Sequence, residues 1–170
     1  PATGDFATGD AAGIVGLWAN KAMTPKVFSA TSSIAAGGEI KHLAFSPSGE
    51  HLATGGADGL VKLWRTDDGS WAADFVGHED AVASLCFSAS GGALISGAAD
   101  GDVRVWDAAR TTPTVILKVN HGPVTSVALS ADSRLLAVGT AERSIVVVQT
   151  AGWWKTTVLR GHVEPVSSLA

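Results

Sequence analysis

The stretch that decides the fold runs from Ala81 to Asp107 and reads AVASLCFSASGGALISGAADGDVRVWD. It holds three short apolar runs, separated by clusters of small and turn-forming residues. Alternation of apolar with small or polar residues over a few positions is typical of β-strands and not of helices. Asp100-Gly101 marks one turn, because glycine readily adopts a positive φ angle and aspartate can bond its own backbone. This stretch therefore predicts three consecutive antiparallel strands.

The same pattern recurs at a fixed spacing along the chain. Residues 39–65 read EIKHLAFSPSGEHLATGGADGLVKLWR, residues 123–149 read PVTSVALSADSRLLAVGTAERSIVVVQ, and both align with 81–107 without gaps. The interval is 42 residues between Phe45, Phe87 and Leu129, and again between Trp64, Trp106 and Val148. The chain opens inside an earlier copy that ends at Trp18 and closes inside a later one. A repeat of this length indicates one supersecondary unit per copy.

Further strands complete each unit. Third strands are expected at 60–65 and 102–107, and fourth strands at 26–30, 71–76, 114–119 and 156–160. Four short antiparallel strands per unit are typical of one blade of a β-propeller. The predicted fold is all-β, with about four four-stranded blades of which the first and last are incomplete. The expected units are a partial blade at 1–36, blades at 37–78, 79–120 and 121–162, and the start of another at 163–170.

At these residues the chain resembles the WD-repeat (WD40) family along its whole length. The matching elements are Gly77-His78, a serine or threonine in the second strand, the Asp-Gly turn, and the closing Trp106-Asp107 or its variant Trp64-Arg65. The resemblance implies a propeller of about seven blades, which would need roughly 300 residues. We therefore expect a segment of a longer propeller protein, completed by further blades of the same chain. Two alternatives remain: the segment 165–170 completes the first blade in cis, giving a four-bladed ring, or in trans, giving a swapped homodimer.

Composition narrows the class of function. A net charge of -4 argues against a nucleic-acid clamp, and no apolar run approaches the roughly 18 residues of a membrane span. The single cysteine, Cys86, excludes an internal disulfide and a cysteine-based zinc site, and its place in an inner strand favours a small buried side chain. We expect a cytoplasmic protein with no metal and no cofactor.

Three residues invite a catalytic interpretation. His78, Ser96 and Asp100 are the residue types of a serine-hydrolase triad, but no Gly-x-Ser-x-Gly nucleophile elbow surrounds the serine. The resemblance implies instead a structural tetrad with Trp106, in which buried donors and acceptors satisfy one another. The preceding copy retains three members, Thr54, Asp58 and Trp64, whereas the following copy has Asn120, Val138, Glu142 and Val148. We expect no catalytic residues and stability that comes mainly from apolar packing between blades.

The other candidates are weaker. His42 and His51 lack carboxylate or cysteine partners at metal-ligand spacing, and His121 fits a loop. Trp153 and Trp154 form an aromatic pair at the start of an outer strand, where they either cover the edge of the blade, which we favour, or form a docking site.

A propeller without such chemistry is most simply a binding platform, and the resemblance implies a scaffold for proteins or peptides. The positions that match the family's protein-contacting face are Glu39, Lys41, Ala57, Ala81, Ala83, Ala99, Pro123, Thr125, Ala141, Pro165 and Ser167. Most are small, which predicts a shallow face. One alternative is an architectural segment of a multi-propeller protein, for example a cytoskeletal or ciliary one. An enzyme on a propeller frame is the other, and it would need convergent polar groups in the channel.

Overall fold

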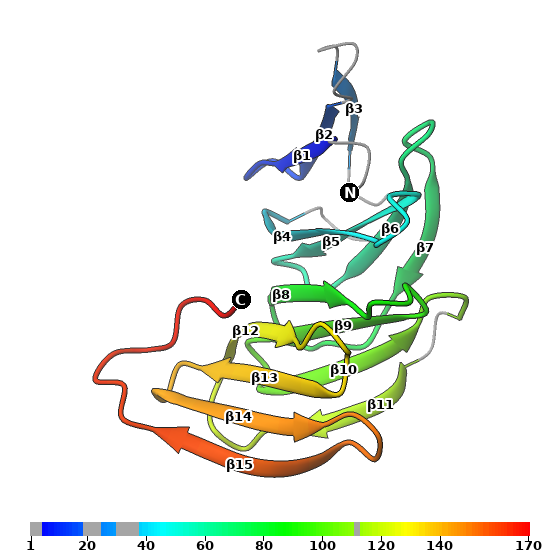
Figure 1. Ribbon diagram of the computed structural model, residues 1–170. Coiled ribbons are helices and arrows are strands. Elements are labelled where there is room, and N and C mark those ends of the chain that lie inside the picture. The colour runs from blue at the N-terminus through cyan, green and yellow to red at the C-terminus, as the bar shows by residue number, and fades with distance from the viewer. Residues whose placement is uncertain (1–4, 19–24, 30–37, 111–112) are drawn as a thin grey trace.

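The computed structural model describes residues 5–18, 25–29, 38–110 and 113–170, and within them every regular element is a β-strand (Figure 1). The first sheet holds β1 (Phe6–Gly9), β2 (Ile14–Trp18) and β3 (Pro25–Ser29). The second holds β4 (Ile40–Phe45), β5 (His51–Gly56), β6 (Val61–Arg65) and β7 (Trp71–Phe75). The third holds β8 (Val82–Phe87), β9 (Ala93–Ala98), β10 (Asp102–Asp107) and β11 (Pro113–Lys118). The fourth holds β12 (Val124–Leu129), β13 (Leu135–Thr140), β14 (Ser144–Gln149) and β15 (Trp154–Arg160).

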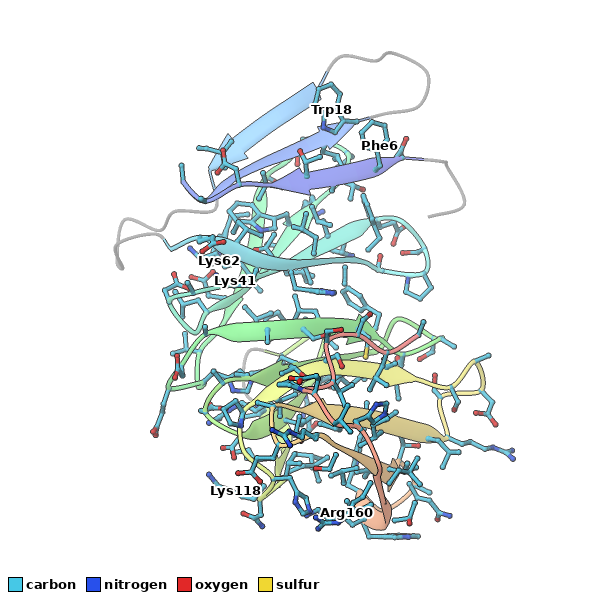
Figure 2. The ribbon with its side chains drawn as sticks, turned by 90° about the vertical axis from the view of Figure 1, so that its left-hand side faces the viewer. Phe6, Trp18, Lys41, Lys62, Lys118 and Arg160 are labelled. Carbon is cyan, nitrogen blue, oxygen red and sulfur yellow. The ribbon has the colours of Figure 1, made fainter. Side chains whose placement is uncertain are left out.

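Each sheet is an antiparallel meander in which neighbours in sequence are neighbours in space. The all-β fold with four-stranded blades is therefore confirmed. The part of the chain that the structure describes contains no helix that could span a membrane. In Figure 1 the four sheets follow one another as a stack, with β1–β3 at one end and β12–β15 at the other. Phe6 and Trp18 stack on each other in the first sheet, with ring centroids 5.7 Å apart (Figure 2).

Glycines in the second strand of each blade let the blades approach closely. A methyl group added at Gly97 would lie 2.5 Å from Cγ1 of Val124, the first residue of the next inner strand. The same contact recurs between Gly55 and Val82, at 2.7 Å. No side chain larger than hydrogen fits at either position without moving the neighbouring blade. These contacts hold the inner strands side by side and define the spacing of the stack.

The expectation of an inner strand at 165–170 is wrong, because this segment joins no strand ladder in the structure. Val166 is nevertheless buried, and its N–H donates to the carbonyl of Thr140 at 3.3 Å. Ile40 begins β4 in the same way, by donating to Asp10 at 3.1 Å. The segment thus lies where a further inner strand would begin. A ladder requires a hydrogen-bonded neighbouring strand, and the described residues supply none.

The alternative of a four-bladed ring closed in cis is also wrong. Among the described strands β1 pairs with β2 alone, and residues 161–170 run back from β15 along the stack and end near β8 and β12, short of the first sheet (Figure 1). The contacts that would close a ring therefore do not form. Closing four blades would need about 90° between neighbours, against roughly 51° for seven, and the close glycine contacts leave little room to widen the angle.

Candidate functional site

A continuous chain of hydrogen bonds joins the four residues of the expected tetrad. Trp106 Nε1 donates to Ser96 Oγ at 2.8 Å, and Ser96 Oγ lies 2.7 Å from His78 Nε2. His78 Nδ1 lies 2.8 Å from an oxygen of Asp100. The residues come from β10, β9, the loop before β8 and the turn between β9 and β10. One chain of bonds therefore connects the two middle strands of the blade to its flanking loops.

The bonding pattern requires a neutral imidazole. The Asp100 carboxylate can only accept, so His78 Nδ1 carries the proton and Nε2 accepts from the Ser96 hydroxyl. Burial, which disfavours the charged imidazolium, lowers the pKa of His78 in spite of the neighbouring carboxylate. Burial also opposes ionisation of Asp100, but hydrogen bonds from Asp102 N–H, His78 and Glu79 N–H outweigh it and lower the pKa of that carboxyl. Every polar group in the chain of bonds thus has a partner.

The order Asp100–His78–Ser96 matches the hydrogen-bond order of a hydrolase triad. These side chains are buried, however, whereas a catalytic serine must be exposed to its substrate. Ser96 has 0% exposure, and the His78 side chain is likewise closed to solvent. Ser96 Oγ already accepts the indole N–H of Trp106, which itself has 0% exposure. A nucleophile must reach a substrate carbonyl beside an oxyanion hole. Within this blade, packing fills the space in front of the serine.

The other blades show how the tetrad degrades. In the second sheet, Trp64 Nε1 donates to Thr54 Oγ1 at 3.1 Å, and Asp58 accepts the N–H of Leu60. In the first sheet, Trp18 Nε1 lies 3.4 Å from Thr8 Oγ1. The fourth sheet lacks the pair, since Val148 and Val138 occupy the corresponding positions. Its turn places Arg143 at φ 64°, where the two preceding blades have Gly59 and Gly101.

The expected protein-contacting residues gather at one end of the blades. Backbone bonds of 2.9 Å join Ala57 N–H to Glu39, Ala99 N–H to Ala81, and Ala141 N–H to Pro123. These pairs place the start of each inner strand beside the turn that follows the second strand. We call this end of the blades the loop face. Its charge is concentrated in one exposed ion pair, Lys41 Nζ to Glu39 at 2.6 Å.

A β-bulge interrupts each inner strand at the same position. Ile40 and His42 pair with adjacent residues of β5, so Lys41 is the extra residue. Ala83 and Thr125 are the extra residues in β8 and β12. A bulge turns the chain locally and redirects a side chain. Lys41, Ala83, Thr125 and Ser167 all line a hollow of about 550 Å³ that the three inner strands share with the C-terminal segment. The spacing of the contact positions is visible in the sequence, whereas the bulge is not.

One side chain in each inner strand links it to the next blade. Leu85 N–H donates to His42 Nδ1 at 3.2 Å, and Val127 N–H donates to Ser84 Oγ at 3.1 Å. Ser126, 42 residues after Ser84, is buried, and its hydroxyl has no hydrogen-bond partner among the described residues. The corresponding donor would be the N–H of Leu169, in the segment that forms no ladder. This link was not predicted from the sequence, although His42, Ser84 and Ser126 share the repeat spacing.

The link at His42 predicts a pH dependence. Burial lowers the pKa of His42, so the native state holds it neutral and its Nδ1 can accept from Leu85. The unfolded chain binds more protons than the native state as the pH falls below about 6.5, so the free energy of unfolding should decrease between pH 7.5 and 5. The His78 imidazole acts in the same direction.

Urea unfolding at pH 7.5 and pH 5 measures this loss. His42→Ser should reduce it, because serine supplies the acceptor that Ser84 supplies in the next blade and does not titrate. The exposed residue His162 provides the control His162→Ser, which should lose as much stability as the wild type. A loss in His42→Ser equal to that of the wild type would contradict the assignment.

The remaining candidates are Cys86 and the aromatic pair Trp153 and Trp154. Burial raises the pKa of Cys86 to about 12, so its thiol is inert. Trp153, at φ 56°, packs against the core between the last two blades, whereas Trp154 begins β15 and is 52% exposed. Among the described residues no cluster of histidine, cysteine and carboxylate side chains could hold a metal ion.

Stacked four-stranded meanders with inner strands side by side define the class of β-propeller proteins. The chain belongs to the WD40 family: the family model described as "WD domain, G-beta repeat" matches residues 28–65, 69–107 and 112–148. The second and third matches each begin near the outer strand of one blade, β7 or β11, and end at the third strand of the next. Each sequence repeat therefore spans two neighbouring blades.

Two curated proteins share one repeat with this chain. WD repeat-containing protein 86 from Homo sapiens is 47% identical over 45 residues, which cover 26% of this chain and 12% of that protein. The periodic tryptophan protein 2 homolog from Dictyostelium discoideum is 45% identical over 42 residues, which cover 25% of this chain and 5% of that protein. The match thus covers a small part of each relative.

Proposed function

We propose that the chain is a protein-interaction scaffold whose loop face holds segments of partner proteins. WD40 repeats generally serve protein–protein interaction, and the finer assignment rests on one observation. The bulge recurs in all three complete blades and brings Lys41, Ala83 and Thr125 to one shared hollow. Bulges are common next to active sites, where they redirect a side chain, so a bulge repeated along this hollow supports contact with other molecules.

The chemistry of the loop face favours an extended peptide with an acidic residue. The described contact positions are largely alanine, so a partner's backbone can approach closely. The Lys41 ammonium is exposed and, among the described residues, forms an ion pair with Glu39 alone. A partner carboxylate would compete with Glu39 for this cation, and pairing at an exposed rim contributes mainly to selectivity. We also propose a cytoplasmic setting, which the single inert cysteine supports.

Selection of random peptides on the immobilised chain tests the scaffold. Peptides that bind the loop face should lose about tenfold in affinity, roughly 1.4 kcal/mol, when Lys41→Glu reverses the charge. The control is Arg110→Glu, because Arg110 is an exposed cation in the turn at the opposite end of the third blade. Neither variant should change the melting temperature, since both side chains are exposed. Selected peptides that bind Lys41→Glu as tightly as the wild type would contradict the assignment of the loop face.

A second function is favoured by the small size of the same residues. Five of the face positions, Ala57, Ala81, Ala83, Ala99 and Ala141, present only a methyl group. Such a face suits an architectural segment that sets spacing in a larger protein, for example a cytoskeletal or ciliary one. A chain that selects no peptides would favour this role over the scaffold.

A further inference from the structure

Residues 161–170 carry the start of a blade without the rest of it. They read GHVEPVSSLA and match residues 77–86, GHEDAVASLC, at five of ten positions. In the third blade the earlier stretch supplies the tetrad histidine, His78, and the inner strand β8. In the single chain, His162 is exposed and residues 161–170 join no strand ladder. This segment thus has the sequence of a histidine loop and an inner strand, without a described strand to pair with.

The contacts of Val166 place the segment where an inner strand begins. A methyl group added at Gly139 would lie 2.7 Å from Cγ1 of Val166. This contact repeats that of Gly97 with Val124 one blade earlier. Thr125 also donates its hydroxyl to the carbonyl of Val166. The first residue of the strand is therefore in position, and what it lacks is an antiparallel neighbour.

The first sheet has the complementary defect. Trp18 Nε1 lies 3.4 Å from Thr8 Oγ1. This pair corresponds to Trp106 and Ser96 in the third blade, where His78 continues the chain of bonds. Among the described residues no histidine bonds the Thr8 hydroxyl, and among the described strands β1 pairs with β2 alone. The described part of the first sheet therefore lacks an inner strand and the histidine that precedes it.

The face of the fourth blade that points away from the third blade is apolar. Leu159 lies opposite Ile145 in the ladder, and Ile145 lies opposite Gly139. Directly opposed residues of antiparallel strands point to the same face, and Val166 touches this face at Gly139. Leu159 is 49% exposed, and Leu135 on the same face is 42% exposed. A further blade would cover these side chains.

The first sheet offers a surface that matches this face. Phe6 is 48% exposed and stacks on Trp18, at the end of the stack opposite to β15 (Figure 2). Trp18 corresponds to Trp106 of the third blade, which packs against Phe75 of the preceding blade. Leu159 lies 84 residues after Phe75. It therefore takes the position that would receive the Trp18 indole.

We infer that two copies of this chain complete each other's open blades. Residues 165–170 of one copy form the inner strand beside β1 of the other copy, antiparallel to it. His162 of the first copy joins Thr8 and Trp18 of the second, with Ala12 at the aspartate position. The Trp18 indole covers the apolar face of the fourth blade. The unpaired strand, the incomplete tetrad and the exposed apolar face thus all find their partners in the second copy.

Two copies joined in this way close into one ring. Four sheets from each copy give eight blades, with about 45° between neighbours. This angle is close to the roughly 51° of a seven-bladed propeller, so the close glycine contacts between blades can stay as they are. Exchange of an identical element between copies is a low-cost route to a symmetric dimer. The ring leaves no blade open.

The complete blades fix the register of the shared strand. In the third blade Cys86 lies opposite Ile95. The corresponding residues are Ala170 in the segment and Ala7 in β1 of the other copy. Opposed Cα atoms of an antiparallel ladder lie about 4.5–5.5 Å apart, a distance that a disulfide can bridge. Cysteines at these two positions should therefore cross-link the copies.

The test uses two single variants of the full chain. Chains with Ala7→Cys and chains with Ala170→Cys are mixed, refolded together and oxidised mildly. The expected product has twice the 17.2 kDa of one chain, and its disulfide joins position 7 of one copy to position 170 of the other. A mixture of Ala7→Cys with Ala151→Cys, at an exposed turn, is the control and should yield about tenfold less product. The Cys86 thiol does not compete, because burial raises its pKa to about 12.

A charge on the covered face should weaken the dimer. Leu159→Glu should raise the dissociation constant, measured by sedimentation equilibrium, at least about tenfold. Ile116→Glu is the matched control, because Ile116 is also 49% exposed but belongs to a blade within the stack. Both side chains are exposed in the single chain, so neither variant should change its melting temperature at low concentration.

Three outcomes would overturn the inference: cross-linking no greater than in the control mixture, equal dissociation constants for Leu159→Glu and Ile116→Glu, or an intrachain disulfide when one chain carries both cysteines. The last result would show that the segment reaches its own first sheet. Neither surface includes Lys41, so these outcomes leave the scaffold proposal untouched.

Discussion

Replacement of Trp106 by alanine is expected to lower the free energy of unfolding by about 3–5 kcal/mol, the usual cost of removing a large aromatic from a packed core. The indole is fully buried between two blades and packs against Phe75. Its loss also leaves Ser96 without the N–H that it accepts. Since small domains are stable by only about 5–15 kcal/mol, the variant should be close to unfolding at physiological temperature.

Urea unfolding at low protein concentration measures this effect. Trp154→Ala is the matched control, because Trp154 is 52% exposed and its replacement should cost little. His78→Ala should cost about 1–3 kcal/mol, because it leaves the buried Ser96 hydroxyl without its acceptor and removes one of the hydrogen bonds to Asp100. A Trp106→Ala variant as stable as Trp154→Ala, or a His78→Ala variant with unchanged stability and a lost hydrolytic activity, would refute the structural role of the tetrad.

Much of the fold could be predicted because the pattern of apolar strands and turn residues recurs at a constant spacing in the sequence. The spacing of 42 residues predicted four strands in each complete blade, and the expected third strand at 102–107 agrees with β10 at both ends. The fourth strand of the last blade begins at Trp154, two residues before the predicted start. The sequence there has no turn glycine at Trp153, which adopts the positive φ angle itself.

The features that concern function were harder to predict, because they depend on how strands and blades meet. The bulge at Lys41 is a shift in register between two strands, and no residue type marks it. The bond from Leu85 to His42 joins residues 43 positions apart and depends on the angle between blades. The tetrad residues themselves came from the family resemblance.

The chain should also associate with itself in solution. Residues 161–170 lie at the position of a further inner strand without pairing in a ladder, and Ser126 beside them is buried with no partner among the described residues. At the other end of the stack β1 pairs with β2 alone among the described strands. Unpaired strand edges and uncovered apolar blade faces favour pairing with another chain. The expected products are dimers or larger assemblies at micromolar concentration.

The chain is an open stack of WD40 blades, and we expect it to need neighbouring blades to cover its ends. Light scattering coupled to size exclusion, at several protein concentrations, tests it most directly. We expect a mass above 17.2 kDa that rises with concentration. A monomer mass that does not depend on concentration, together with a sharp cooperative melt, would show that the blades close on themselves and would contradict the account.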